Sequence, residues 1–246
     1  MSALAMNLAY ADPSVVTPVD PPENKVAPES EKSLKPSPPL VQEVSPGVFK
    51  IGKLTIKKDS REISFSAETK ITGPDEILEF LLVHRNGEKI HETLLVTDAD
   101  PEHIQIALKL LRFKESNELF RVIKPDGTRK KEFYSVPEDI RKAARFDIHL
   151  MTDQDGEKKS FPANDWVTHR VLKKPMPLQP WVFNGSYIHE NKFNAKLTGS
   201  IFAIFSNMGA IANYSGEGRE DDSLWLPSKR VLATGSKVTV ILKPWK

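Results

Sequence analysis

His84, His91, Glu92 and His103 are the side chains of this chain whose types and spacing could bind a metal ion or move a proton. Two imidazoles on one face of a hairpin can hold one ion, and a nearby carboxylate or third imidazole can complete the ligand set or act as general base. His84 and His91 become diagonal neighbours if the chain reverses midway between them. One hypothesis is therefore a metal-dependent hydrolase that uses His84 and His91 with Glu92 or His103.

Glu92 points away from His91, because neighbouring residues of a strand face opposite sides of the sheet. The same register places Glu92 among apolar side chains, where an unpaired carboxylate costs several kcal/mol. We expect His103, or the first amides of the following helix, to pair with Glu92 and to pin the helix to the hairpin. This interpretation makes Glu92 a structural group rather than a catalytic acid.

Trp181 and Trp225 belong to a set of four tryptophans, and rings of this size either fill cores or line ligand grooves. Trp181 stands in the segment Gln-Pro-Trp-Val-Phe-Asn-Gly-Ser. If Trp181 and Trp225 flank an open apolar groove, a glycan or a peptide could lie in it. A binding function predicts that groove, whereas enclosed rings would remove it.

The composition excludes several classes of protein. The chain has no cysteine, which excludes disulfides, iron–sulfur clusters and thiol catalysis. The formal net charge is +2 and the basic residues are dispersed, so the sequence lacks the basic face of a nucleic-acid-binding protein. No apolar run reaches the roughly 18 residues that a membrane-spanning helix needs. We expect no cofactor other than the metal ion of the hydrolase hypothesis.

The stretch from residue 78 to residue 113 must position these groups. Asn86-Gly87 between two apolar runs predicts a type I′ turn, because this turn needs positive φ at both central residues. Both faces of the resulting hairpin are apolar, which indicates a central hairpin covered on both sides. Asp100 suits the N-cap and Pro101 the first position of the next helix. That helix should lay an apolar stripe on the hairpin: Ile104, Ala107, Leu108 and Leu111.

The rest of the folded part is rich in strand signals. Alternating or β-prone segments predict strands at 48–57, 62–70, 120–124, 145–151, 158–161, 181–188, 200–205, 211–214 and 237–242. Short helices are predicted near 135–138 and 162–169. We therefore predict a single α+β domain over residues 47–246. It consists mostly of antiparallel strands, with one main helix packed on the central hairpin and one or two short helices.

The N-terminal part differs in composition. Residues 1–11 are small and apolar, and Ala9-Tyr10-Ala11 fits the pattern before a signal-peptidase cut, although the basic start of a signal peptide is missing. A start upstream of Met1 would reconcile the two observations. Residues 12–46 are rich in proline, serine and charge, which predicts a disordered linker.

Several short motifs resemble a known family. They are Gly52-x-Leu54, Ile90-His91-Glu92-Thr93-Leu94-Leu95, Asp100-Pro-x-His103-x-x-x-Ala107-Leu108, Trp181-x-Phe183-x-Gly185-Ser186, Trp225-x-Pro227 and Gly235-Ser-x-Val-Thr239. Together, over residues 48–244, they resemble the YdjY-domain proteins, extracytoplasmic proteins of Planctomycetes and Verrucomicrobia. The family has no assigned activity, so the resemblance supplies no catalytic residue. Some members have cysteines for ferredoxin-type clusters, and this chain has none.

These observations favour a non-enzymatic, periplasmic or secreted binding or structural module. Its expected partner is a cell-envelope protein, a peptide or a glycan, held near Trp181, Trp225, Glu92 and His103. Nucleic acid and a membrane-spanning segment are excluded. The alternative is the metal-dependent hydrolase, with His84 and His91 as metal ligands.

Overall fold

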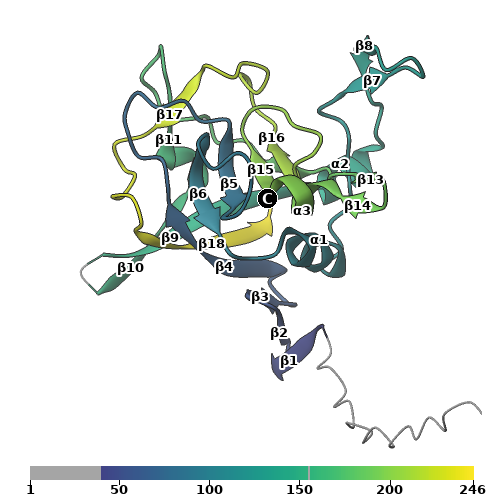
Figure 1. Ribbon diagram of the computed structural model, residues 1–246. Helices are drawn as coiled ribbons and strands as arrows, with labels where there is room; N and C mark the ends of the chain where they lie inside the picture. Colours follow the sequence, from purple (N-terminus) through teal and green to yellow (C-terminus); the bar gives the residue numbers. More distant parts are fainter. Residues whose placement is uncertain (1–39, 155) are drawn as a thin grey trace, which may run out of the picture. The chain divides into compact units, whose positions relative to one another are not determined.

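Eight strands pair edge to edge and close into a barrel in the computed structural model, which describes residues 40–154 and 156–246 (Figure 1). Around the barrel the order is β4, β18, β9, β12, β16, β15, β5, β6, and β6 pairs with β4 again. The pairs β15–β16 and β5–β6 are parallel, and the other neighbours are antiparallel. The barrel strands are β4 (Glu62–Thr69), β5 (Phe80–His84), β6 (Thr93–Thr97), β9 (Arg145–Gln154), β12 (Trp181–Phe183), β15 (Ser200–Ala203), β16 (Ala212–Tyr214) and β18 (Lys237–Pro244).

The other elements extend or cover the barrel. The further strands are β1 (Gln42–Ser45), β2 (Val48–Ile51), β3 (Leu54–Lys57), β7 (Arg121–Ile123), β8 (Arg129–Phe133), β10 (Glu157–Pro162), β11 (Val167–His169), β13 (Ile188–His189), β14 (Lys192–Phe193) and β17 (Trp225–Pro227). The helices are α1 (Pro101–Leu110), α2 (Glu138–Ala143), α3 (Asn194–Thr198) and the 3₁₀ helix η1 (Ala163–Trp166). None of these helices is long and apolar enough to cross a membrane within the described part of the chain.

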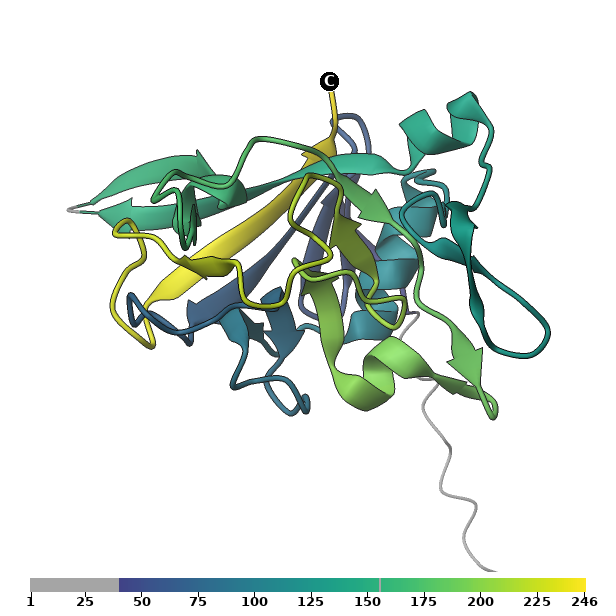
Figure 2. The same ribbon diagram turned by 90° about the horizontal axis from the view of Figure 1, so that it is seen from above.

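The strands β4 and β9 each use one edge for two partners. The first half of β4 pairs with β3, which leads outward to β2 and β1, and its second half pairs with β6. The start of β9 pairs with β12, and its end pairs with β10. Figure 2 shows the β9–β10 hairpin extending away from the barrel. A closed ring leaves no free edge, whereas these extensions do.

Alternate residues of the barrel strands fill its interior. On β4, Ile63 and Phe65 are buried, because successive strand residues face opposite sides. Phe146, Trp181 and Tyr214 pair in one row across β9, β12 and β16, and all three are buried. These aromatic side chains form the centre of the main core.

The predicted α+β class is wrong. About 40% of the described residues lie in strands and 12% in helices, so the fold is a barrel rather than a helix packed on a hairpin. The helical stripe itself is correct: Ile104, Ala107 and Leu108 are buried in the main core. The N-cap is correct too, since the Asp100 carboxylate accepts the Glu102 N–H at 2.9 Å.

The predicted central hairpin is also wrong. The strands β5 and β6 are parallel, with Phe80 beside Thr93, and residues 85–92 return the chain to the start of β5. Neither Asn86 nor Gly87 has the positive φ of a type I′ turn. A Cβ at Gly87 would lie 2.9 Å from the Thr198 carbonyl oxygen. Gly87 therefore permits a close backbone approach to the residues before β15, which the short-range pattern does not reveal.

The N-terminal predictions lie mostly outside the described residues. The signal-peptide remnant at 1–11 and the linker as far as residue 39 belong to this group. The strand β1 begins at Gln42, inside the segment predicted as linker, and pairs with β2. The described fold therefore starts several residues before the predicted boundary at residue 47.

Candidate functional site

Arg145 begins β9 and lies on the outer face of the barrel. The next residue, Phe146, points into the core, so the side chains on either side of it face outward. The backbone N–H of Trp245 donates to the Arg145 carbonyl, so the end of β18 lies beside the start of β9. Two strands further around, the Ser215 hydroxyl donates to the Pro180 carbonyl at 2.7 Å. Four adjoining strands thus form one wall of a site outside the barrel.

The segment between α1 and β9 covers this wall. The Ser116 N–H donates to the Phe183 carbonyl at 2.9 Å, which anchors the segment to β12. Leu119 and Phe120 pack on Val182 and form a small apolar cluster separate from the main core. The short helix α2 then follows the β7–β8 hairpin and leads into β9. Its position brings the side chain of Arg141 over the same wall.

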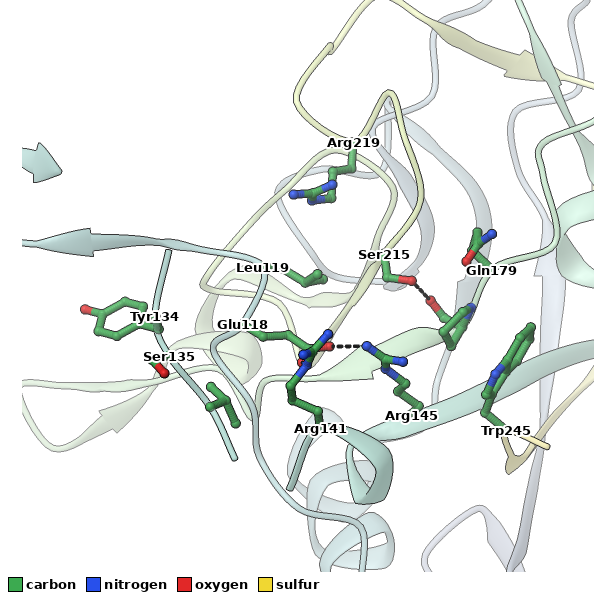
Figure 3. A pocket seen from close by; sticks show the side chains of 12 residues that line it. Glu118, Leu119, Tyr134, Ser135, Arg141, Arg145, Gln179, Ser215, Arg219 and Trp245 are labelled. Atoms are coloured by element: carbon green, nitrogen blue, oxygen red, sulfur yellow. Dashed lines mark hydrogen bonds and ion pairs between the residues drawn. The ribbon is translucent and has the colours of Figure 1, made fainter. Parts of the chain in front are cut away.

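A cavity of about 490 Å³ lies between the wall and its cover. Its lining residues are Glu118, Leu119, Tyr134, Ser135, Val136, Arg141, Arg145, Gln179, Pro180, Ser215, Arg219 and Trp245. We call it the arginine pocket, after Arg141, Arg145 and Arg219. Figure 3 shows Glu118 between Arg141 and Arg145, with Trp245 beside Arg145.

Glu118 is the only carboxylate in the lining of this pocket, and two arginines already hold it. Arg141 Nε donates to its Oε2 at 2.6 Å, and Arg145 Nη2 donates to its Oε1 at 3.1 Å. The Glu118 side chain is only 9% exposed, so these charge-assisted bonds offset the cost of removing its charge from water. The carboxylate therefore orders the two guanidinium groups.

Arg219 supplies positive charge that no wall carboxylate balances. Its Nη1 donates to the Gly216 carbonyl at 3.4 Å, and its guanidinium lies 5.8 Å from the centre of the Phe133 ring. The Nε atoms of Arg145 and Arg219 are buried and have no hydrogen-bond partner among the described residues. Among the lining residues, three guanidinium groups face one carboxylate, and one carboxylate outside the lining, Glu138, lies 3.5 Å from Arg141. The remaining excess of positive charge suits an anion.

The structure separates the two predicted metal ligands. His84 pairs with Thr97 at the end of β5, whereas His91 comes just before Thr93, at the other end of the β5–β6 pair. His84 Nδ1 accepts the Asn86 N–H, and the His91 side chain is 67% exposed beside Glu92. No group of three or more histidine, aspartate or glutamate side chains within 40–154 and 156–246 could hold a metal ion.

Glu92 has partners, but they are Lys89 and His91 rather than His103. The expectation that Glu92 points away from His91 is wrong, because His91 Nε2 lies 3.1 Å from Glu92 Oε1 in the loop before β6. Lys89 Nζ lies 2.7 Å from Glu92 Oε2, and the Glu92 side chain is 24% exposed. Burial raises the pKa of the neighbouring Glu79, and a hydrogen bond with Glu92 raises it further. His103 packs instead against Gly52, where an added Cβ would lie 2.5 Å from its Nδ1. Glu92 and His103 therefore do not form one site.

Trp181 and Trp225 are core residues, each only 1% exposed. Tyr214 lies between them, with ring centroids 5.9 Å from Trp181 and 6.1 Å from Trp225. Trp225 Nε1 also donates to the Gly218 carbonyl. Neither ring can offer a face to a ligand, so the predicted groove between them is absent. Trp245, by contrast, lines the arginine pocket.

Reasoning from the sequence missed the arginine pocket. Its charged residues come from 118 to 219, and the sequence shows their basic members as dispersed. One signal was available: Arg141 and Arg145 are four residues apart, Arg141 on α2 and Arg145 at the start of β9. That spacing brings side chains together on a helix but says nothing about Glu118 or Arg219.

Comparison with known proteins gives one match. A family model of the YdjY domain matches residues 54–243, which includes the barrel strands except the last residue of β18, and the lining residues of the pocket up to Arg219. No curated protein and no solved structure matches the chain. The match spans more than half of the chain and agrees with the resemblance seen in its motifs. The chain therefore belongs to the YdjY domain family.

Proposed function

We propose that this protein is a non-enzymatic binding module that holds a carboxylate-bearing ligand in the arginine pocket. The net positive charge of the pocket carries the proposal. Guanidinium groups bind carboxylates through parallel N–H bonds, and they keep their charge at any physiological pH. Glu118 fixes Arg141 and Arg145 in place before a ligand arrives, which lowers the entropy cost of binding.

The groups in the lining argue against catalysis. Both oxygens of Glu118 accept from guanidinium groups, so this carboxylate is not free to act as a base. The Ser215 hydroxyl donates to the Pro180 carbonyl and has no adjacent base in the lining. The hydrolase alternative loses its basis as well, because His84 and His91 lie at opposite ends of the β5–β6 pair.

Small anions test the proposal directly. The full chain is titrated with sodium acetate, sodium succinate and sodium phosphate at constant ionic strength, and its thermal unfolding is followed. A ligand at one hundred times its Kd stabilises the folded state by about 2.7 kcal/mol. We expect the carboxylates to raise Tm, and the variants Arg145→Gln and Arg219→Gln to reduce that rise.

Arg170→Gln is the matched control, because Arg170 is exposed and lies outside the pocket lining. The control should keep the full response to acetate and succinate. Equal responses in Arg145→Gln, Arg219→Gln and Arg170→Gln would show nonspecific ion effects and reject the proposal.

The proposal places the protein outside the cytoplasm, in the periplasm or secreted. Its support is the sequence pattern at Ala9-Tyr10-Ala11 and the proline-rich segment that follows. N-terminal mapping of the native protein and cell fractionation test it. A native protein that begins at Met1 and fractionates with the cytosol would reject this location.

A further inference from the structure

A second hollow adjoins the arginine pocket. Its volume is about 740 Å³, and we call it the hairpin groove because part of it lies along the β7–β8 hairpin. Its lining residues are Leu119, Phe120, Arg121, Ile123, Arg129, Tyr187, Phe205, Ser206, Asn207, Met208, Gly209 and Glu220. Figures 1 and 2 both show the β7–β8 and β13–β14 hairpins on the same side of the barrel. The groove uses residues next to both hairpins.

The arginine pocket and the hairpin groove are lined by shared and by consecutive residues. Leu119 lines both, and the consecutive residues Arg219 and Glu220 line one each. The cluster of Leu119, Phe120 and Val182 lies beneath this region, and Met208 packs against it. A ligand held by its carboxylate in the arginine pocket would therefore find an apolar surface next to its binding point.

The groove exposes apolar side chains that a ligand could cover. Ile123 is 40% exposed and Tyr187 is 46% exposed. Covering such side chains is favourable in proportion to the apolar area removed from water. Ile123, at the end of β7, and Tyr187, directly before β13, line one hollow and form a surface suited to a side chain of the ligand.

Polar groups in the same groove favour a peptide over a hydrocarbon chain. Ser206 Oγ is buried and has no hydrogen-bond partner among the described residues. Asn207, Arg121 and Glu220 also belong to the lining. Arg121 and Glu220 form an ion pair, with 3.6 Å between Nη2 and Oε2, and Asn207 Oδ1 accepts the Gly209 N–H. The amide groups of a peptide can add hydrogen bonds to these side chains, whereas a hydrocarbon chain can add none.

A buried asparagine network holds one side of the groove in shape. Asn213 Nδ2 donates to Asn184 Oδ1 at 2.7 Å and to the Asn207 carbonyl at 2.9 Å. The Asn207 N–H donates to Asn213 Oδ1 at 2.7 Å. Asn184 Nδ2 donates to the Met208 carbonyl. The loop that carries Ser206, Asn207 and Met208 is therefore formed before a ligand binds.

We infer that the arginine pocket and the hairpin groove together bind the C-terminal end of a peptide. The free terminal carboxylate lies against the arginines, and large apolar side chains of the last residues lie in the groove. This inference rests on the proposed carboxylate binding and adds the class of ligand to it. Charge complementarity at the pocket and the lining residue Leu119 that the two hollows share are its basis.

A synthetic peptide library tests the inference. The probe is a pool of hexapeptides with four randomised C-terminal positions, made once with a free carboxylate and once as the C-terminal amide. The immobilised full chain retains peptides, and mass spectrometry identifies them. We expect large apolar residues at the last positions to be enriched about threefold or more over the pool, and retention of the amide pool to fall about tenfold.

Single variants show whether the groove is responsible. Ile123→Ser and Tyr187→Ser remove exposed lining side chains, so the fold should tolerate them. Both should weaken binding of a retained peptide about tenfold in fluorescence polarisation. Ile188→Ser is the matched control, because Ile188 is 74% exposed but outside the groove lining, and it should bind as the unmodified chain does.

The outcomes separate the two proposals. If acetate stabilises the protein through Arg145 but the library shows no apolar preference, the peptide inference fails and carboxylate binding stands. If the amide pool is retained equally, the terminal carboxylate has no role and the inference is overturned. Displacement of a retained peptide by dodecanoate with higher affinity would identify a hydrocarbon ligand instead. If neither anions nor peptides bind, both proposals fall.

Discussion

Arg145 Nη2 donates to Glu118 Oε1 at 3.1 Å and joins the start of β9 to the segment that covers the barrel wall. The Glu118 side chain is 9% exposed and the Arg145 side chain is 27% exposed. The bond therefore lies in a partly water-excluded setting, where an ion pair is stronger than at an exposed site. The same bond positions a guanidinium group of the arginine pocket.

The substitution Glu118→Gln should separate stability from anion binding. It leaves Arg141 and Arg145 without their shared carboxylate, so we expect the free energy of unfolding to fall by about 1–3 kcal/mol. It also removes one negative charge from the pocket, while the amide oxygen can still accept from one guanidinium group and keep it ordered. Acetate should therefore stabilise this variant more than the unmodified chain. Urea denaturation with and without acetate measures both effects.

Glu138→Gln is the control for that substitution. Glu138 also pairs with Arg141, at 3.5 Å, but its side chain is 61% exposed. Solvent screening makes such pairs weak, so its stability should stay within about 0.5 kcal/mol of the unmodified chain. Equal losses from Glu118→Gln and Glu138→Gln would contradict the special role of Glu118.

The substitution Asn213→Ala should loosen the loop over the hairpin groove. Asn213 is fully buried, and its side chain makes hydrogen bonds with Asn184 and Asn207. Losing them leaves buried polar groups unpaired, so we expect a cost of roughly 2–4 kcal/mol. Backbone hydrogen exchange should become faster at residues 205–210. The control Asn117→Ala, at an exposed position, should change neither the free energy of unfolding nor this exchange rate. Unchanged exchange in Asn213→Ala would show that other contacts hold the loop.

The substitution Gly52→Ala should destabilise the β2–β3 turn for two reasons. Gly52 has φ +51°, and an added Cβ would lie 2.5 Å from His103 Nδ1. The backbone conformation alone should lower the free energy of unfolding by about 1 kcal/mol. Gly127→Ala should show this loss by itself, because Gly127 has φ +81° and open space around it. The clash with His103 should raise the total loss in free energy of unfolding for Gly52→Ala to roughly 2–4 kcal/mol. In a His103→Ala background the cost of Gly52→Ala should return to about 1 kcal/mol.

The pKa of Glu79 predicts a pH-dependent effect. Burial first, and then a hydrogen bond with Glu92, raise the pKa of Glu79 above its ordinary value of 4.5. As the pH rises, Glu79 therefore loses its proton in the unfolded chain before it does so in the folded protein. The free energy of unfolding falls as the pH rises from 4.5 through the raised folded pKa. Glu79→Gln should be more stable than the unmodified chain at pH 7.5, and this gain should disappear near pH 4. Glu88→Gln, at an exposed position of the loop between β5 and β6, serves as control in Tm measurements at both pH values.

Removing metal ions should leave the thermal stability of the protein unchanged. His84 and His91 lie at opposite ends of the β5–β6 pair, so one ion cannot bind both. We expect the same Tm with and without EDTA, and the same metal content in His84→Ala and His91→Ala as in the unmodified chain. A stoichiometric metal that either substitution abolishes would restore the hydrolase hypothesis.

The sequence alone determined the local features of this protein. The N-cap at Asp100, the buried stripe of α1 and the alternation of β4 depend on the periods of helix and strand, which a short segment contains. The family was also readable from its motifs. A local pattern sets which side of an element is apolar, because that depends only on residues within a few turns or pleats.

Only the tertiary structure decided the topology and the site. The Asn86-Gly87 pair resembles a hairpin turn, yet β5 and β6 are parallel because β6 closes the barrel against β4 and Gly87 packs near Thr198. The arginine pocket assembles residues from 118 to 245. Which strands become neighbours depends on long-range pairing around a common core, and no short stretch of sequence contains that information.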